Sequence, residues 1–332
     1  MTVRLGVVGV GSLGKEHARI AASLPGAVLS AVCDANRARA EEIGAKWKAP
    51  AFADWRELRG KVDAVIVATP TQFHREAAAF FLEGGVPCLV EKPLAGTVED
   101  SRALVELAQK KGVALQVGHI ERFNPSWTVA RPGMGHVKFV QAERVGPYPF
   151  RSTDIDVVLD LMIHDIDLVL SLTQAPVARV DAWGTRVLSP TNDLVSARIR
   201  FEDCLVANLT ASRVSPDPAR RFRTFSEEAF TTIDLRGRVI SRVSRSAKLK
   251  AGFDVASVDP TKIPNLKEFL YGELFATETP AVAPGEPLAL EDGAFVEAVS
   301  RKTAPRVTGE DGLRAVELAH RVLSAVRESA GA

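Results

Sequence analysis

Two clusters of titratable residues have the types and spacing needed to move a proton between a hydroxyl group and the protein. Lys92 lies in Glu91-Lys92-Pro93 at the end of a predicted strand. A lysine there can hydrogen-bond a substrate hydroxyl and stabilise the oxyanion that forms as hydride leaves. Asp160 and His164 are four residues apart and share a face if their segment is helical. A histidine beside a carboxylate suits proton transfer near neutral pH, so both clusters predict acid–base chemistry on an alcohol.

Each cluster also has a plainer interpretation. Most lysines are solvated surface groups, and an Asp–His pair on a helix can serve as a cap or a salt bridge. Zinc binding by Asp160 and His164 is a further alternative, but no third soft ligand is evident nearby, so we expect no metal. Pro93 adds a structural hint, because an X-Pro bond at a strand end is a candidate cis peptide that would aim Lys92 inward.

A glycine-rich turn near the start of the chain has the spacing of a phosphate-binding loop. The apolar run Val3 to Val8 is followed by Gly9-Val10-Gly11-Ser12-Leu13-Gly14 and then by a helical pattern. Gly9 permits the sharp turn, Gly11 lets the backbone approach the phosphates, and Gly14 lets the helix lie close on the strand. We expect Ser12 and Leu13 to lie against the same pyrophosphate.

Asp34 supplies the second half of a dinucleotide site. It ends a second apolar strand, 20 residues past Gly14, where an acidic residue would bind the ribose hydroxyls. Its charge would repel a 2′-phosphate, so the sequence favours NAD over NADP, although Arg37 and Arg39 could offset part of that repulsion. The alternative is a helix-opening turn with a surface aspartate.

The elements that must position these residues alternate between strand and helix up to Val117. Predicted strands cover 61–68, 87–90 and 113–117, and predicted helices cover 37–45, 75–84 and 97–112. This alternation predicts an α/β Rossmann domain with a doubly wound parallel sheet. Thr69-Pro70-Thr71 with His74, and Glu91 with Lys92, then follow the carboxyl ends of strands, where ligands bind in such sheets.

The pattern changes near Ser126 to alternating apolar and polar residues, typical of half-buried strands. Predicted strands cover 137–145, 177–187, 194–201, 205–212 and 230–235, and predicted helices cover 156–172, 266–276, 290–301 and 312–329. We expect an α+β domain with a large, mainly antiparallel open sheet. The predicted domains are residues 1–122 for the dinucleotide and 123–332 for substrate and oligomer contacts, with a cleft between them and the last helices packing back on the first domain.

Composition excludes several classes of function. The 332 residues carry 42 Lys and Arg against 41 Asp and Glu, which leaves no net field for nucleic acid or an acidic membrane. Cys33, Cys88 and Cys204 have no metal or redox spacing, as expected in a reducing compartment. No apolar run reaches the ~18 residues of a membrane span, and the chain enters its first strand at once, without room for a signal peptide. We expect a cytoplasmic protein.

Taken together, the motifs resemble the glucose-fructose oxidoreductase and inositol dehydrogenase family over almost the whole chain. The resemblance rests on the Gly9–Gly14 turn, Thr69-Pro70-Thr71 with His74, Glu91-Lys92-Pro93, Gly118 with Arg122-Phe123-Asn124-Pro125, and Asp160 with His164. It implies an NAD(P)-dependent dehydrogenase acting on CH–OH groups and forming a homodimer or homotetramer. Lys92 and His164 become the catalytic pair, and Asp160 orients the histidine or contacts the sugar. The cofactor would also contact Thr69, Pro70, Thr71, His74, Glu91 and Lys92, and the substrate Lys92, Arg122, Asn124, Asp160 and His164.

Within the family, segments 118–125 and 160–168 are most similar to the branch that oxidises nucleotide-linked amino sugars. That similarity implies oxidation of carbon 3 of UDP-N-acetylglucosamine to a 3-keto sugar, for lipid A or surface polysaccharide synthesis. A buried diphosphate needs cations, and the candidates are Arg144, Arg151, Arg213, Arg220, Arg221 and Arg223. The alternatives are a dehydrogenase of a free sugar, inositol or sugar acid on the same fold, and a non-catalytic dinucleotide-binding regulator.

Overall fold

The computed structural model of the protein describes residues 2–150 and 155–330. The chain forms two compact units. The first comprises Met1–Phe123, Ile166–Leu170 and Gly285–Arg321, and the second comprises Asn124–Asp165, Ser171–Pro284 and Val322–Ala332. The division into independent domains at residues 122 and 123 stays a prediction.

A six-stranded parallel sheet forms the centre of the first unit, as predicted. Its strands are β1 (Val3–Val8), β2 (Ala27–Cys33), β3 (Ala51–Phe52), β4 (Ala64–Val67), β5 (Cys88–Glu91) and β6 (Leu115–Gly118). Their order is β3-β2-β1-β4-β5-β6, and every neighbouring pair is parallel. All four residues of β4 are apolar and buried, as expected of a strand covered on both faces. The short edge strand β3 lacks a run long enough to recognise in the sequence.

Helices pack around this sheet and end where capping residues stop them. They are α1 (Gly14–Ala21), α2 (Arg37–Trp47), α3 (His74–Glu83), α4 (Val98–Lys111), α9 (Pro287–Arg301) and most of α10 (Gly309–Ala330). The hydroxyl of Thr97 accepts from the Asp100 N–H at 3.1 Å at the start of α4. Gly112, with φ of +64°, ends it. Phe295 and Val296 of α9 belong to the core around β1 and β2, as expected of helices that pack back on this unit.

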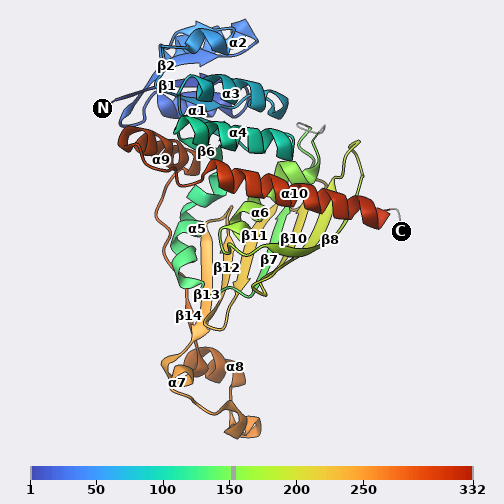
Figure 1. The fold of residues 1–332 in the computed structure, drawn as a ribbon. Coiled ribbons are helices and arrows are strands. Elements are labelled where there is room, and N and C mark those ends of the chain that lie inside the picture. The colour runs from blue at the N-terminus through green and yellow to red at the C-terminus, as the bar shows by residue number, and fades with distance from the viewer. Residues whose placement is uncertain (1, 151–154, 331–332) are drawn as a thin grey trace. The chain divides into compact units, whose positions relative to one another are not determined.

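The second unit is built on an eight-stranded open sheet, most of whose strands are visible in Figure 1. Its strands are β7 (Phe139–Val145), β8 (Val177–Thr185), β9 (Leu194–Phe201), β10 (Val206–Ser212), β11 (Ala219–Phe225), β12 (Ala229–Asp234), β13 (Val239–Arg245) and β14 (Phe275–Glu278). The order is β14-β13-β12-β11-β7-β10-β9-β8. Only β7 and β10 pair in parallel, which confirms the mainly antiparallel sheet. We missed β11 because three arginines obscure its alternation.

The helical segments of the second unit differ from the prediction, which lacked α5 (Pro125–Ala130) and α7 (Ala247–Lys250). The segments also include the start of α6 (Ile163–Leu170), α8 (Leu266–Glu268) and two π-helical turns, Val158–Met162 and Phe269–Leu274. The helix predicted over 156–172 is thus a π-helical turn followed by α6. The helix predicted over 266–276 is wrong at its end, because Phe275–Glu278 pairs with β13 instead. Among residues 2–150 and 155–330, no helix is long and apolar enough to cross a membrane.

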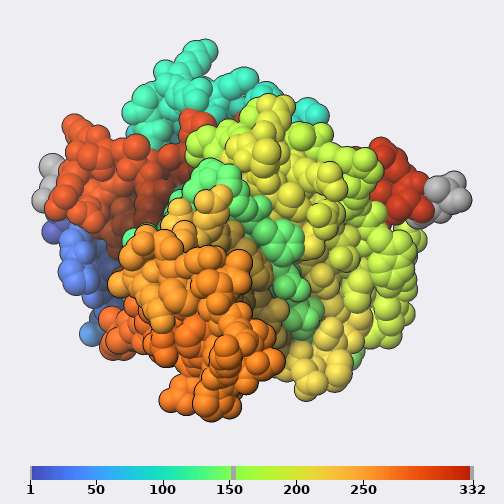
Figure 2. Space-filling view, turned by 90° about the horizontal axis from the view of Figure 1, so that it is seen from below, coloured from blue at the N-terminus to red at the C-terminus, as the bar shows by residue number. Residues whose placement is uncertain are grey.

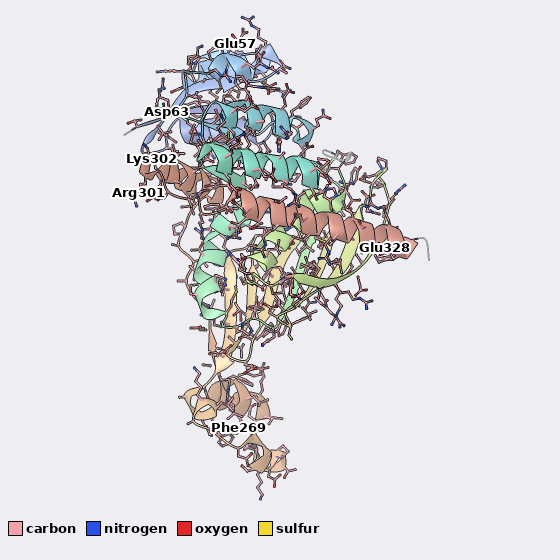
Figure 3. The ribbon with its side chains drawn as sticks, viewed as in Figure 1. Glu57, Asp63, Phe269, Arg301, Lys302 and Glu328 are labelled. Carbon is pink, nitrogen blue, oxygen red and sulfur yellow. The ribbon has the colours of Figure 1, made fainter. Side chains whose placement is uncertain are left out.

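Residues 246–274 form a lobe between β13 and β14 with few buried side chains. They give the orange surface in Figure 2. The Lys248 ammonium lies 4.5 Å from the ring centre of Phe253 and 5.2 Å from that of Phe269, which is labelled in Figure 3. Lys248 also pairs with Glu273 at 2.6 Å. Exposed contacts of this kind, rather than an apolar core, hold the lobe together.

Candidate active site

The glycine-rich turn fits a bound diphosphate. Gly9 has a φ of +83°, and a Cβ there would lie 2.7 Å from the Thr69 backbone nitrogen. A Cβ at Gly14 would lie 1.7 Å from the Gly9 oxygen, so α1 approaches the turn more closely than any side chain allows. A Cβ at Gly11 would meet only the Arg39 guanidinium, at 3.7 Å. The backbone at Gly11 is therefore open to a ligand, and the N-terminus of α1 favours an anion.

Asp34 lies against this turn, as the dinucleotide prediction requires. One of its carboxylate oxygens accepts from the Val10 N–H at 3.0 Å and contacts the Arg39 guanidinium at 3.3 Å. The other accepts from the Asn36 N–H at 2.9 Å. Arg37 is engaged elsewhere, in an exposed pair with Glu41 at 2.8 Å. Arg39 is therefore the cation placed to soften the repulsion between Asp34 and a 2′-phosphate.

The loop after β4 joins the turn to the strand that carries Lys92. His74 is buried, and its ring nitrogens lie 2.8 Å from the Thr69 carbonyl oxygen and 2.9 Å from that of Pro93. Burial lowers the pKa of His74. A neutral ring has a single N–H, which donates to only one of these two carbonyl oxygens. The Thr69 hydroxyl is buried without a hydrogen-bond partner among the described residues, an orphaned donor beside Gly9 that a cofactor can engage. His74 thus positions this edge of the site.

Lys92 follows β5 directly, and the Lys92–Pro93 bond is cis, as the sequence suggested. The carboxylate of Glu91 accepts from the Lys92 N–H at 3.2 Å. The other Glu91 oxygen lies 2.9 Å from His17 of α1, whose second ring nitrogen is 2.9 Å from Asp292 of α9. Neither His17 nor Asp292 belongs to a motif that predicts a role for it. Because they are 275 positions apart, no local signal could have linked them.

Two of the carboxylates next to the predicted catalytic histidine are held in buried ion pairs. In the second unit, Asp165 makes a two-point pair with Arg144 at 3.0 and 2.9 Å. In the first unit, Asp167 lies 3.3 Å from Arg122, and burial raises its pKa to about 7 despite the arginine. Arg122, a predicted substrate ligand, thus contacts Asp167 in the structure.

Asp160 and His164 both lie in the second unit, at the junction of the π-helical turn and α6. Asp160 belongs to the turn, and His164 is the second residue of α6. Such turns are frequent at functional sites because they re-aim side chains within a helix. Asn124 is buried, caps α5 through the Ser126 N–H at 3.1 Å, and donates to the Leu235 oxygen at 2.9 Å. Lys92 belongs to the first unit, so the Lys92–His164 pair, like the remaining site residues, stays a prediction.

Several of the candidate diphosphate ligands line one cavity of about 340 Å³. Arg144, Arg213 and Arg220 line it together with Asp160 and Arg236. Arg144 and Arg213 are also buried in ion pairs with Asp165 and Asp193. Arg236 was missed, because it follows a predicted strand without a motif of its own. Arg221 and Arg223 lie on β11, and Arg151 lies outside the described residues.

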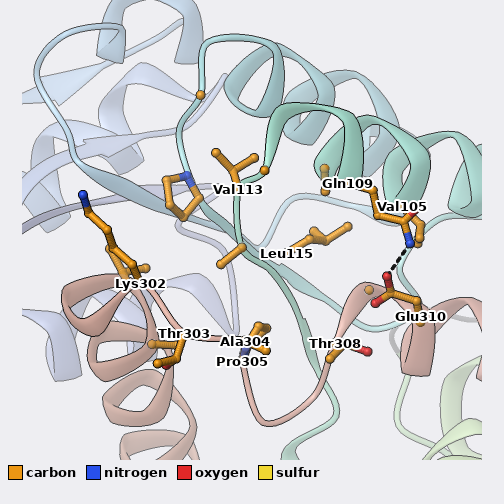
Figure 4. Close-up of a pocket in the computed structure, with 18 residues that line it drawn as sticks. Val105, Gln109, Val113, Leu115, Lys302, Thr303, Ala304, Pro305, Thr308 and Glu310 are labelled. Carbon is orange, nitrogen blue, oxygen red and sulfur yellow. Dashed lines mark hydrogen bonds between the residues drawn. The ribbon is translucent and has the colours of Figure 1, made fainter.

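A larger cavity of about 660 Å³ lies at the opposite end of the first sheet (Figure 4). Val113 and Leu115, at the start of β6, line it together with Thr308, and the Gln109 amide donates to Glu310 at 2.7 Å beside it. Its position at the amino ends of the strands separates it from Lys92 and the glycine turn. Over the described ranges, no group of three His, Cys, Asp or Glu side chains is arranged to hold a metal ion.

Comparisons with known proteins agree with this arrangement. Residues 3–119 match the family model described as "Oxidoreductase family, NAD-binding Rossmann fold", and residues 129–230 match the "GFO/IDH/MocA C-terminal domain". The UDP-N-acetylglucosamine 3-dehydrogenase of Acidithiobacillus ferrooxidans is 39% identical over 246 residues, or 74% of this chain and 78% of that protein. A solved structure of that enzyme superposes with a TM-score of 0.87 at 33% identity over 99% of both chains. The scyllo-inositol 2-dehydrogenase (NAD(+)) of Bacillus subtilis is 32% identical over 64% of this chain and 68% of that protein.

Proposed function

We propose a substrate and a mechanism on the premise that this chain belongs to the GFO/IDH/MocA oxidoreductase family and is a dehydrogenase. The proposed reaction is the NAD-dependent oxidation of carbon 3 of UDP-N-acetylglucosamine to the 3-keto sugar, for lipid A or surface polysaccharide synthesis. The observation that carries it is the likeness to a UDP-N-acetylglucosamine 3-dehydrogenase over the full length of both chains. The scyllo-inositol 2-dehydrogenase of Bacillus subtilis is less similar in sequence, at 32% identity against 39%.

In the proposed mechanism His164 takes the proton of the sugar hydroxyl, and Asp160 orients its ring or contacts the sugar. The ammonium of Lys92 hydrogen-bonds the same oxygen and stabilises the charge that develops on it. Bound NAD supplies the hydride acceptor at its nicotinamide ring. The contribution of the chain is to hold the hydroxyl between these groups and to position the cofactor through the glycine turn.

NAD is the proposed cofactor rather than NADP. The Asp34 carboxylate lies at the turn through its bond to the Val10 N–H and would oppose a 2′-phosphate. Its exposed partner Arg39 offsets only part of that charge, because the pair is open to solvent on the arginine side.

A nucleotide-linked substrate is supported by the cavity in the second unit. Asp160, the proposed partner of the sugar, lines it together with Arg220 and Arg236. Guanidinium groups suit a diphosphate, because each offers parallel N–H donors to phosphate oxygens. A free sugar or an inositol would leave this part of the cavity unused.

A substrate panel tests the proposal with the full-length protein. Reduction of NAD⁺ is measured with UDP-N-acetylglucosamine, UDP-glucose, N-acetylglucosamine, myo-inositol and a sugar acid. We expect the highest kcat/KM for UDP-N-acetylglucosamine, and a product whose mass and NMR spectrum identify the 3-ketone. Turnover of inositol or a free sugar alone would replace this substrate, and NAD binding without turnover of any sugar would support a regulator.

The cavity provides a second arm of the test. Arg236→Gln should raise KM for the UDP-sugar by about 10-fold or more, since a charged hydrogen bond contributes ~1.5–3 kcal/mol. The matched control is Arg301→Gln on the exposed surface of α9. An unchanged KM in Arg236→Gln contradicts the diphosphate site without contradicting the dehydrogenase.

A further inference from the structure

His17 sits between two carboxylates in the interior of the first unit. Its Nε2 lies 2.9 Å from Glu91 Oε1, and its Nδ1 lies 2.9 Å from one Asp292 oxygen and 3.1 Å from the other. His17 and Asp292 are fully buried, and Glu91 nearly so. Since α1, β5 and α9 each contribute one member, the three side chains join elements that are far apart in the sequence.

With both carboxyl groups ionised, these contacts place a proton on each ring nitrogen of His17. A neutral imidazole has one N–H, so one of its two nitrogens would direct a lone pair at a carboxylate oxygen. Burial opposes the charged form, but the Asp292 and Glu91 carboxylates together raise the pKa of His17 well above its usual range. Burial, with the nearby Glu91 carboxylate, raises the pKa of the neighbouring Glu291 well above the usual range, which favours its neutral form.

The imidazolium fixes the carboxylate of Glu91 on the side facing Lys92. Glu91 Oε2 accepts from the Lys92 N–H at 3.2 Å. Gly118 on the adjacent β6 leaves just enough room, because a Cβ there would lie 2.8 Å from the carboxyl carbon of Glu91. The carboxylate is therefore held by His17, by the Lys92 backbone and by the close approach of β6, with little freedom to shift.

The contact between His17 and Glu91 also connects this strand end to the cofactor turn. His17 lies three residues past Gly14, in the first turns of the helix that begins at the phosphate loop. A shift of α1 along the sheet would break its bond to Glu91. One buried imidazolium thus sets the distance between the turn that holds the diphosphate and the strand end that carries Lys92.

We propose that His17 is a positioning residue that acts through Glu91 on Lys92 and keeps the Lys92 ammonium in register with the cofactor turn. This inference rests on the proposed catalytic role of Lys92. A displacement of about 1 Å at a reacting group can cost on the order of 10²-fold in rate, so loss of the link should appear in kcat.

The experiment compares His17→Gln with His320→Gln in the full-length enzyme. His320 lies on α10 and contacts the Gly96 oxygen at 3.1 Å in an exposed setting. We expect His17→Gln to lower kcat by about 10- to 100-fold, with KM and the NAD⁺ dissociation constant each within about 3-fold of the parent. His320→Gln should leave all three unchanged. An unchanged kcat in His17→Gln overturns the inference.

A double variant separates positioning from general loss of structure. In a Lys92→Ala background, His17→Gln should lower the residual kcat by less than about 2-fold, because both changes remove the same contribution. A full additional loss would show that His17 acts independently of Lys92. If Lys92→Ala leaves turnover unchanged, the proposed catalytic role of Lys92 is wrong. If Lys92→Ala lowers turnover but His17→Gln does not, only the positioning role of His17 is wrong.

Two further measurements cover the case in which His17→Gln does not fold. Gly118→Ala displaces the Glu91 carboxylate without changing any charge, and it should lower kcat in the same way. Nitrogen-15 NMR of the parent should show both ring nitrogens of His17 protonated at pH 8. A ring with a single N–H at that pH, or a Gly118→Ala variant with parental kcat, overturns the proposal.

Discussion

Lys92 is the residue on which the proposed chemistry depends most directly. It stands at the carboxyl end of a buried parallel strand, and its backbone N–H is tied to the side chain of Glu91. The backbone at this position is held before any substrate arrives, so the enzyme does not have to order it during the reaction.

We expect Lys92→Ala to lower kcat by about 10²- to 10⁴-fold, the range for a positioned acid–base group, with NAD⁺ affinity within about 3-fold of the parent. The cofactor turn lies on other residues, so its geometry is retained. Steady-state kinetics and NAD⁺ titration measure both quantities. Lys110→Ala on the exposed face of α4 is the control. Loss of NAD⁺ binding in Lys92→Ala, or parental turnover, contradicts the assignment.

Asp167 should make stability depend on pH. Burial raises its pKa from 3.8 to about 7 in the folded protein. A folded pKa above the unfolded one stabilises the fold fully at low pH, and this contribution is lost as pH rises through about 7. Asp167→Asn removes the titration, so the free energy of unfolding of the parent should fall relative to that of the variant between pH 5 and pH 8. Urea titrations at both pH values measure it, and a constant difference would refute the expectation.

Among the elements, the connection between β8 and β9 is held by a single buried carboxylate. Asp193 accepts from the N–H groups of Val187, Leu188 and Ser189 at 2.8, 2.6 and 2.9 Å. It also pairs with the buried Arg213 at 2.8 Å, which donates in turn to the Ile155 oxygen at 2.8 Å. The pair thus joins the β8–β9 loop, the end of β10 and the approach to the turn that carries Asp160.

Asp193→Asn should destabilise the fold by ~3–5 kcal/mol, because it leaves a buried guanidinium without its carboxylate. Burial by itself would raise the pKa of Asp193. Hydrogen bonds from Ser189 and Arg213 outweigh this effect and hold the pKa below its usual range. A lowered pKa contributes stability that is present above pH ~4 and lost on acidification, so the variant should unfold less steeply with acid than the parent. Urea and acid titrations measure both effects. Glu41→Gln, which breaks an exposed pair, should cost less than ~1 kcal/mol.

At the scale of the molecule, one face of the second unit's sheet carries exposed side chains. Trp183 of β8 is 56% exposed, and Gln141, Glu143 and Arg198 line an open cavity beside it. Phe225 stacks on Phe230 at 4.5 Å toward the other end of the sheet. An exposed sheet face with aromatic groups is typical of a surface that binds another protein, which agrees with the homodimer or homotetramer implied by the resemblance.

Trp183→Glu should shift the protein to a smaller species, because it places a charge on the exposed sheet face that we expect to join two subunits. Light scattering coupled to gel filtration measures the mass. Val28→Glu, on the exposed side of β2, is the matched control and should leave the mass unchanged. If Trp183→Glu has the same mass as the parent protein, or if the parent is a monomer, this sheet face is not the subunit interface.

Much of the first unit followed from the sequence alone. Continuous apolar runs predicted its parallel strands, and Thr97 and Gly112 marked the ends of α4. Glycine spacing with Asp34 predicted a cofactor turn, and Asp34 accepts from the Val10 N–H of that turn. These features are local, because a strand or cap is decided by residues within a few positions of it. The motif also located Glu91 and Lys92 at the end of a central strand.

Only the tertiary structure decided which charges neutralise one another. Arg144 and Arg213, predicted as candidate ligands, are buried ion-pair partners that line the same cavity as Asp160, and Arg236 lines that cavity too. His17 and Asp292 are in contact because α9 packs in the core of the first unit. The periodicity of apolar residues in the sequence predicts which face of a helix or strand is buried. The partner of a buried charge is set by packing between distant segments, and the strong cost of an unpaired buried charge makes that choice decisive.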